Sequence, residues 1–394
     1  MRRAVIYAAM IAIILAGAVL ASLALRDRDG VGTSSPTPSA SAAATTTAAS
    51  TAPAATVGGS PTAAQSLVND RFGFVVQNRG ATVRSETSEA AVSSFAPKDR
   101  SFVSLSRMVS PDGRLVAYWD PVDSGAVLRV RSVSGGDARA VLTGRPEMSG
   151  NAFSWSFDSA GLVAALDNNC FEVCGGAQVS ELWTVEVASG ATEKIATGSI
   201  WLPVAWDRTA KLVAAGVTGP GGYVTGYDVV DLSRQPYAVR STPFQPALLG
   251  RLKASDDARY AFVSVALEGG PSSLVWWPIA HPETRSSVAF DGYSAEWRPG
   301  TSEIWWVGGL EPAGCRIELC SGTQLSSINV ATGARAVVRG RFGSLLEGFR
   351  VDGTAVIIAA SGSVRTELTL IEIATGRTAA VSIGGSLAGA VRLR

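Results

Sequence analysis

The stretch Val109-Ser110-Pro111-Asp112-Gly113, followed by the apolar run Leu115-Val116-Ala117-Tyr118, decides the fold. Asp can hydrogen-bond to its own backbone and Gly tolerates a positive φ, so the first five residues predict a tight turn. The short apolar run after it is typical of a buried β-strand. The same turn and strand recur in five degenerate copies: Trp155 to Ala165, Trp206 to Ala215, Ala254 to Val263, Trp297 to Val307 and Phe349 to Ile358.

The copies are regularly spaced along the chain. The residues that we take as equivalent are Asp112, Asp158, Thr209, Asp256, Gly300 and Asp352, which are separated by 46, 51, 47, 44 and 52 residues. A second turn recurs at Ser189-Gly190, Thr332-Gly333 and Thr375-Gly376, each after an alternating strand. It predicts a hairpin between a third and a fourth strand. A period of about 40–50 residues with four short strands is typical of a β-propeller blade.

The two ends of the repeat region predict how the ring closes. Three short strands are expected at Phe72 to Gln77, Ala81 to Ser85 and Ala90 to Phe95, and Leu387 to Leu393 is similar to the first strand of a blade. Together they make one further blade from both ends of the chain, which removes exposed strand edges. We therefore predict an all-β, seven-bladed β-propeller; a six-bladed ring is the alternative.

The repeat resembles the TolB-type, WD40-like propeller repeats. Their motif is an aromatic or apolar residue, then Ser, Pro, Asp and Gly, then an apolar strand. The match covers about Phe102 to Ile383 in six copies, and Ser110-Pro111-Asp112-Gly113 is the copy nearest to the full motif. The resemblance implies the fold and no particular reaction, because the motif is structural.

The N-terminus predicts export. Residues Ala4 to Leu25 form an apolar run of 22 residues, which as a helix spans roughly 33 Å, enough to cross a hydrocarbon core. Arg2 and Arg3 precede the run, so the positive-inside rule leaves residues 1–3 in the cytoplasm and places the rest outside. We predict a transmembrane signal-anchor helix at residues 4–25. The alternative is a cleaved signal peptide, which would release a secreted protein.

A linker is expected between this segment and the propeller. From Gly32 to Ala64 the chain consists almost wholly of Ser, Thr, Ala, Pro and Gly and carries no charged or aromatic residue. Such a composition buries too little apolar surface to offset the entropy of ordering. We therefore expect a disordered linker at residues 26–67 and the propeller domain at residues 68–394.

Four cysteines form two local pairs, Cys170 with Cys174 (CFEVC) and Cys315 with Cys320 (CRIELC). An even number of cysteines in an exported chain predicts disulfides. A four-thiolate metal site is the alternative, although distant blades do not readily assemble one.

Both cysteine pairs fall between the second and third strands of their blades, in the long loops Asp167 to Val179 and Gly308 to Thr323. These blades are the second and the fifth, so their loops should face each other across one mouth of the channel. Long loops on a rigid scaffold are where binding usually resides. The hypothesis is a recognition rim whose tips carry Phe171, Glu172, Arg316 and Glu318; loops pinned only against proteolysis are the alternative.

The rest of the sequence offers no catalytic, cofactor or metal motif. Lys and Arg (34) nearly balance Asp and Glu (33) without a basic cluster, which argues against nucleic-acid binding. The single histidine, His281, precedes a proline and is expected in a solvated turn. In the pairs Trp276-Trp277 and Trp305-Trp306, one ring is expected to pack between blades and the other to lie at a strand face or rim. The recurring Asp residues are expected to form turns.

The function that the sequence favours is a membrane-tethered scaffold outside the cytoplasm that binds or senses an envelope protein, a peptide or a glycan. A propeller enzyme of the lyase, lactonase or glycoside hydrolase type, with carboxylates and Arg in the central funnel, is the rival class. A third is an accessory subunit of a membrane assembly, for which Gly17 and Ala21 would lie on one face of the anchor helix.

Overall fold

The structure is a computed structural model. It describes residues 67–77, 81–88, 90–95, 108–122, 125–144, 148–168, 180–198, 200–218, 224–248, 252–265, 272–292, 294–311, 321–343, 345–360 and 367–393. The expected anchor (4–25) and nearly all of the expected linker (26–67) lie outside these ranges. Within the ranges, no helix has the length and apolarity that a membrane span requires.

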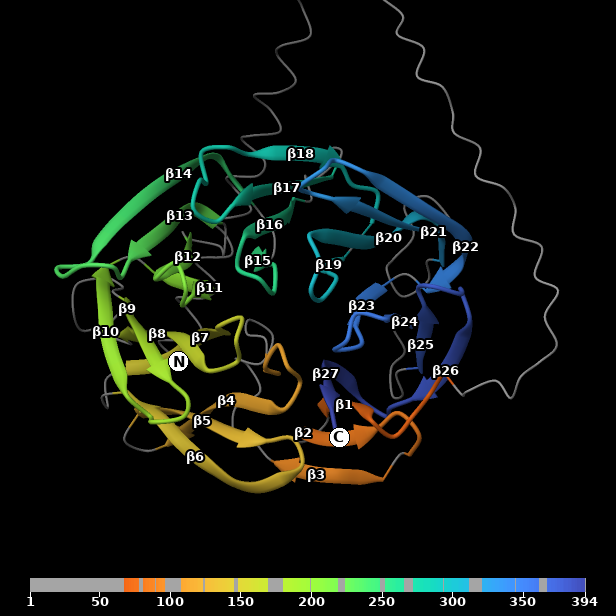
Figure 1. The fold of residues 1–394 in the computed structure, drawn as a ribbon, viewed down its shortest axis with the longest axis horizontal. Coiled ribbons are helices and arrows are strands. Elements are labelled where there is room, and N and C mark those ends of the chain that lie inside the picture. The colour runs from red at the N-terminus through yellow and green to blue at the C-terminus, as the bar shows by residue number, and fades with distance from the viewer. Residues whose placement is uncertain are drawn as a thin grey trace, which may run out of the picture. The chain divides into compact units, whose positions relative to one another are not determined.

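The described strands form seven antiparallel sheets around a central axis (Figure 1). Blade 1 contains β4 (Leu115–Val122), β5 (Gly125–Ser132) and β6 (Gly135–Thr143); blade 2 contains β7 (Met148–Trp155), β8 (Gly161–Asn168), β9 (Ser180–Glu186) and β10 (Thr192–Gly198); blade 3 contains β11 (Trp201–Asp207), β12 (Leu212–Thr218), β13 (Val224–Asp231) and β14 (Ala238–Leu248). Blade 4 contains β15 (Leu252–Ala254), β16 (Tyr260–Val265), β17 (Ser273–Pro278) and β18 (Ser286–Ala289); blade 5 contains β19 (Ala295–Trp297), β20 (Glu303–Glu311), β21 (Ser321–Asn329) and β22 (Arg335–Gly343); blade 6 contains β23 (Leu345–Phe349), β24 (Ala355–Ala360), β25 (Glu367–Glu372) and β26 (Thr378–Ser382).

Blade 7 closes the ring with strands from both ends of the chain. Its order is β27 (Ser386–Arg392), β1 (Phe72–Gln77), β2 (Ala81–Ser85) and β3 (Ala91–Phe95), and Phe74 on β1 lies opposite Ala390 on β27. Figure 1 shows β27 on the inner side of the ring and β3 on the outer side. The predicted seven-bladed ring and its shared blade are confirmed, and the six-bladed alternative is wrong.

The turn between the first two strands of a blade repeats one hydrogen-bond pattern. The Ser110 hydroxyl donates to Asp112 Oδ1 at 2.6 Å, and the same carboxyl oxygen accepts the Arg114 amide at 3.1 Å. Blade 2 repeats these bonds with Ser156, Asp158 and Ala160 at the same two distances. The recurring carboxylates therefore hold the backbone of their own turns, as expected.

Blade 4 corrects one assignment. The residue in the place of Asp112 is Asp257, which accepts the Ser255 hydroxyl at 2.6 Å and the Arg259 amide at 3.1 Å. The alignment of the repeats in the sequence predicts Asp256 at this position of the turn, but Asp256 precedes it by one residue. The hydroxyl of Ser255 and the positive φ of 53° at Ala258 set the register of the turn. The Ser-x-Asp spacing that Ser255 and Asp257 share with Ser110 and Asp112 was the signal in the sequence that could have identified Asp257.

Both rings of each tryptophan pair pack in the core, whereas one ring of each was expected at a strand face or rim. Trp277 is fully buried and makes edge contacts with Tyr227 and Phe244, with ring centroids 5.3 and 5.1 Å away. Trp305 contacts Phe349 of the next blade. Neighbouring residues of a strand point to opposite faces, and each face of a blade lies against another blade. Both rings of a Trp-Trp pair are therefore buried, one on each side of the sheet.

A buried ion pair joins blades 6 and 7. Arg350 donates from Nε to Glu86 Oε1 at 2.9 Å and from Nη2 to Glu86 Oε2 at 2.7 Å. Its Nη2 also donates to the Leu67 carbonyl at 2.7 Å, and the guanidinium lies 4.9 Å from the centroid of the Phe72 ring. The side chains are 6% and 1% exposed, so water screens this pair very little.

We predict that Glu86→Ala strongly destabilises the propeller. Removing one partner leaves the Arg350 guanidinium buried and unpaired, which costs about 3–5 kcal/mol. The measurement is the free energy of unfolding in urea. Arg259→Ala is the matched control, because Arg259 pairs with Asp257 at the surface and such pairs contribute less than about 1 kcal/mol. Equal losses in the two variants would contradict the role assigned to the buried pair.

Candidate functional site

The two long loops of the predicted recognition rim connect second to third strands, as expected. Residues 169–179 join β8 to β9 in blade 2, and residues 312–320 join β20 to β21 in blade 5. The four cysteines and the four predicted tip residues lie in these segments, outside the described residues. The described strand ends at the base of each loop show how the loops are supported. These strand ends are called the loop stems below.

Asp291 connects the two strands of the loop stem in blade 5 through hydrogen bonds. It lies between blades 4 and 5 and accepts three hydrogen bonds: Trp306 Nε1 at 2.9 Å, the Gly309 amide at 2.9 Å and Gln324 Nε2 at 3.0 Å. Trp306 and Gly309 belong to β20 and Gln324 to β21. One carboxylate therefore joins the crossover from blade 4 to both strands of the loop stem.

Gly308 makes this arrangement sterically possible. A Cβ atom at position 308 would lie 2.4 Å from Asp291 Oδ1 and 2.8 Å from its Cγ, so any larger residue would displace the carboxylate. Asp291 was not singled out in the sequence. The available signal was Gly308-Gly309 inside an apolar strand, because glycine within a strand often marks a close approach of another group.

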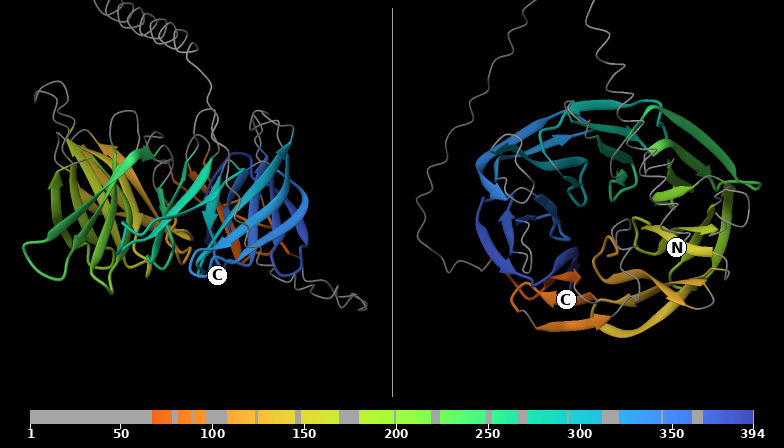
Figure 2. Two further views of the ribbon diagram at one scale, coloured as in Figure 1. Left: turned by 90° about the horizontal axis from the view of Figure 1, so that it is seen from above. Right: turned by 180° about the vertical axis from the view of Figure 1, so that it is seen from behind.

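The stem in blade 2 also contains a carboxylate. The fully buried Ser180 on β9 donates its hydroxyl to Asp167 Oδ1 on β8, and the two residues are direct cross-strand neighbours. Blades 2 and 5 lie on opposite sides of the central axis (Figure 1). Both stems belong to second-to-third connections, which in an antiparallel meander all emerge at one end of the blades. The side view in Figure 2 shows the strands running between the two ends of the ring.

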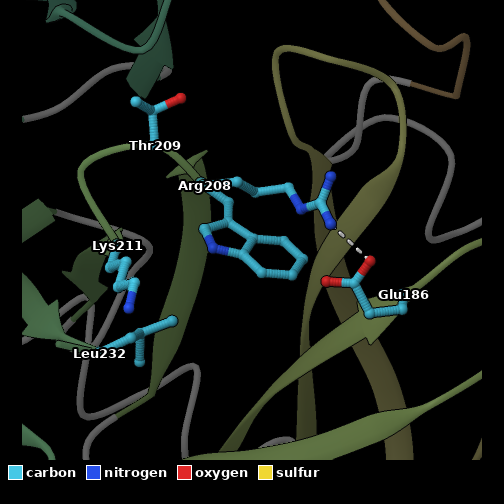
Figure 3. A pocket seen from close by; sticks show the side chains of 6 residues that line it. Glu186, Arg208, Thr209, Lys211 and Leu232 are labelled. Atoms are coloured by element: carbon cyan, nitrogen blue, oxygen red, sulfur yellow. Dashed lines mark hydrogen bonds and ion pairs between the residues drawn. The ribbon is translucent and has the colours of Figure 1, made fainter. Parts of the chain in front are cut away.

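The opposite end of the ring carries a pocket of about 350 Å³ between blades 2 and 3 (Figure 3). Its lining residues are Glu186, Trp206, Arg208, Thr209, Lys211 and Leu232. Arg208 forms two ion pairs at this pocket: Nη1 lies 2.5 Å from Asp158 Oδ2, and Nη2 lies 2.6 Å from Glu186 Oε2. The guanidinium also lies 5.4 Å from the centroid of the Trp206 ring.

The charges of this pocket stabilise one another. Partial burial opposes ionisation of Asp158, but hydrogen bonds from Ser156, the Ala160 amide and Arg208 outweigh it and hold the pKa of Asp158 below its usual value. Partial burial likewise opposes charge on Arg208, and its bonds to Asp158 and Glu186 nevertheless raise its pKa. Through its contacts with Asp158 and Glu186, Arg208 joins blades 2 and 3 as a charged link. Its charge is already neutralised by two carboxylates.

The innermost strands carry a further ion pair. Lys253 on β15 binds Glu296 on β19 and donates to the Ala295 carbonyl at 2.9 Å. The pair connects blades 4 and 5 close to the central axis. In the part of the chain that the structure describes, no group of three His, Cys, Asp or Glu side chains could hold a metal ion. His281 is exposed in a turn, as predicted, with Nδ1 3.1 Å from Glu283 Oε1.

The sequence and the fold were compared with those of known proteins. No protein-family model and no curated protein matches the sequence. Among solved structures, the chain is similar to the tricorn protease, with a TM-score of 0.50 at 14% identity, over 83% of this chain and 34% of that one. The chain has a β-propeller fold, which is the fold that the resemblance to TolB-type, WD40-like repeats implied.

Two further similarities are weaker. TolB from Acinetobacter baumannii gives a TM-score of 0.43 at 13% identity, over 82% of each chain. An oligogalacturonate lyase in complex with manganese gives a TM-score of 0.39 at 12% identity, over 79% of this chain and 94% of that one. At such identities the likeness concerns the fold alone, since one propeller scaffold carries many unrelated functions.

We predict that Gly308→Ala loosens the blade 5 stem. The new methyl group would displace the Asp291 carboxylate, so the indole N–H of the buried Trp306 would lose its acceptor, which costs about 1–3 kcal/mol. The exposed donors of Gly309 and Gln324 can bond to water instead. Urea unfolding measures the loss. Gly198→Ala is the control, because a Cβ there would meet Trp201 at an ordinary 3.4 Å. A Gly308→Ala variant as stable as the Gly198→Ala variant would refute the steric argument.

We also predict a pH-dependent difference between the wild type and Asp158→Asn. The folded pKa of Asp158 lies below the ordinary 3.8, so its carboxylate contributes stability above that pH, and the contribution is lost as the pH falls through the folded value. Thermal melting should show a more stable wild type at pH 7 and a narrowing difference below about pH 3.8. In an Arg208→Gln background the difference at pH 7 should shrink. A difference that is constant from pH 7 to pH 2.5 would contradict the prediction.

Proposed function

We propose that the chain is a membrane-tethered propeller outside the cytoplasm that binds an envelope protein, peptide or glycan through the rim that carries the loops 169–179 and 312–320. The observation that carries the proposal is the pair of braced loop stems. Each stem contains a carboxylate that hydrogen-bonds across the strands, at Asp167 and at Asp291.

The loops are long for their position. They contain 11 residues (169–179) and 9 residues (312–320), whereas β-hairpin loops usually contain 2–5. Long loops lose more conformational entropy when a partner orders them, and a rigid base lowers that cost. Two long loops on braced stems, on opposite sides of the axis, suit a partner that spans the mouth of the channel. The local cystines expected at Cys170 with Cys174 and at Cys315 with Cys320 would restrict the tips further.

Tethering is supported by the sequence. The apolar run of residues 4–25 follows Arg2 and Arg3, and the Ser/Thr/Ala/Pro-rich linker separates it from the propeller. A flexible chain of about 40 residues has an end-to-end distance of roughly 35 Å, which would hold the domain clear of the lipid surface. An exported location also agrees with the paired cysteines.

An enzyme has less support from the described residues. A lyase or hydrolase in the funnel would require carboxylates and arginines that are available to a substrate. On the innermost strands β15 and β19, Lys253 and Glu296 pair with each other. The Arg208 cluster at the other end is likewise neutralised internally. Binding at the loop rim is therefore the function with the better support.

The proposal predicts that substitutions at the loop tips abolish partner capture. The full-length chain is expressed in its own cells, crosslinked on intact cells and analysed by mass spectrometry. Combined alanine substitution of Phe171, Glu172, Arg316 and Glu318 should reduce the main crosslinked species about tenfold or more, since a few central residues carry most of the binding energy. Ser189→Ala with Thr332→Ala, in hairpins at the opposite rim, is the matched control.

Unchanged crosslinking in the tip variant would refute the rim as the binding surface. The same cells test the location. Protease added to intact cells should remove the propeller, and the wild-type chain should stay with the membrane fraction after washing at high salt. A chain found in the medium with a new N-terminus would contradict the anchor, and a chain fully protected from protease would contradict export.

A further inference from the structure

The outer strand of blade 5, β22, is exposed along most of its length. Its first seven residues, Arg335 to Arg341, are all exposed. In the other described outer strands the longest such run is four residues, in β14. Val337 and Val338 are 54% and 49% exposed, two of the five large apolar residues exposed in the described part of the chain. Outer strands are usually protected by charges along their length, so apolar residues exposed in the middle of one leave its edge suited to pairing with a further strand.

The strand carries an unbalanced positive charge. Between Ser321 and Gly343 the chain contains Arg335, Arg339 and Arg341 and no Asp, Glu or Lys. In the described residues, none of these three arginines takes part in an ion pair, in contrast to Arg129, Arg208, Arg298 and Arg350. A partner for this surface should therefore carry carboxylates.

The backbone of β22 is open on its outer side. The strand is the last of its sheet and pairs only with β21. From Arg335, opposite Ile328, to Arg339, opposite Gln324, the pairing is regular, and the register shifts only beyond Arg339. Along such an edge, alternate residues direct free N–H and C=O groups outwards, which can accept a further strand.

We propose that β22 binds an acidic, extended peptide segment by adding it to blade 5 as a fifth strand. The side chains of Arg335, Val337 and Arg339 share one face of the strand, because strand residues alternate. A partner with two carboxylates flanking one apolar residue at alternate positions would place each group opposite its complement, at the Cβ spacing of about 5 Å that cross-strand pairs show. The motif that fits is Glu-x-Val-x-Glu.

Arginines on an edge strand can also serve only to prevent edge-to-edge aggregation. Protection against aggregation explains the charges of the arginines but does not explain the two exposed valines between them. If the arginines only prevented aggregation, an acidic peptide would not bind to β22. Measuring peptide binding therefore distinguishes a docking role from protection of the edge. β22 is the outermost strand of blade 5 (Figure 1), and the test of its surface uses none of the loop-tip residues, so it is independent of the function proposed above.

The test uses the full-length chain in a neutral detergent and a fluorescein-labelled peptide, Thr-Thr-Glu-Thr-Val-Thr-Glu-Thr-Thr. Fluorescence anisotropy should show binding that weakens as salt rises from 50 to 500 mM, because exposed charges are screened. Arg335→Glu with Arg339→Glu should weaken binding about tenfold or more, since like charges then oppose each other. Arg114→Glu with Arg234→Glu, two exposed arginines elsewhere, is the matched control and should bind as the wild type does.

Hydrogen exchange distinguishes strand addition from simple charge attraction. Bound peptide should slow exchange of amides in β22 and leave those of β14 unchanged. Charge-dependent binding without slower exchange in β22 would overturn strand addition. Equal binding of a peptide with Lys in place of Glu, or no binding of the Glu peptide, would overturn the proposal. So would binding only to vesicles that contain anionic phospholipid, which would assign the arginines to a lipid surface.

Discussion

Closure of the ring is the constraint on which the rest of the structure depends. Each blade buries apolar side chains on both of its faces, so a blade without a neighbour on one side would expose a core surface. Strand β27 from the C-terminus completes the sheet that β1, β2 and β3 begin, and the bidentate Arg350–Glu86 pair joins that sheet to blade 6. Contacts between residues more than 260 positions apart thus complete blade 7 and join it to blade 6.

Many of the carboxylates that the structure describes serve the scaffold. Asp112 and Asp158 hold turns, Glu86 joins two blades and Asp291 braces a loop stem. The two binding surfaces proposed above, the rim loops and the arginines of β22, do not use these four carboxylates.

The turn-and-strand repeat made most of the fold predictable. Ser110-Pro111-Asp112-Gly113 predicts a turn from local backbone preferences alone, and the structure contains it. The seventh blade followed from counting strands at the two ends, and the cysteine pairs were correctly placed between second and third strands. The turn at Asp256 was misassigned although the sequence carried the signal: Ser255 and Asp257 have the Ser-x-Asp spacing of Ser110 and Asp112, and the Ser255 hydroxyl bonds Asp257 in the structure.

The sequence by itself determined the local features: the turns, the alternating strands, the number of blades and the apolar character of the Trp pairs. These depend on residues close together in the chain, whose geometry follows from backbone and side-chain preferences. Only the tertiary structure decided that Glu86 faces Arg350, that Arg208 bridges Asp158 and Glu186, and that Asp291 approaches Gly308. Each of these contacts joins neighbouring blades or a crossover to a strand, and its partners are set by how the sheets pack and not by sequence spacing.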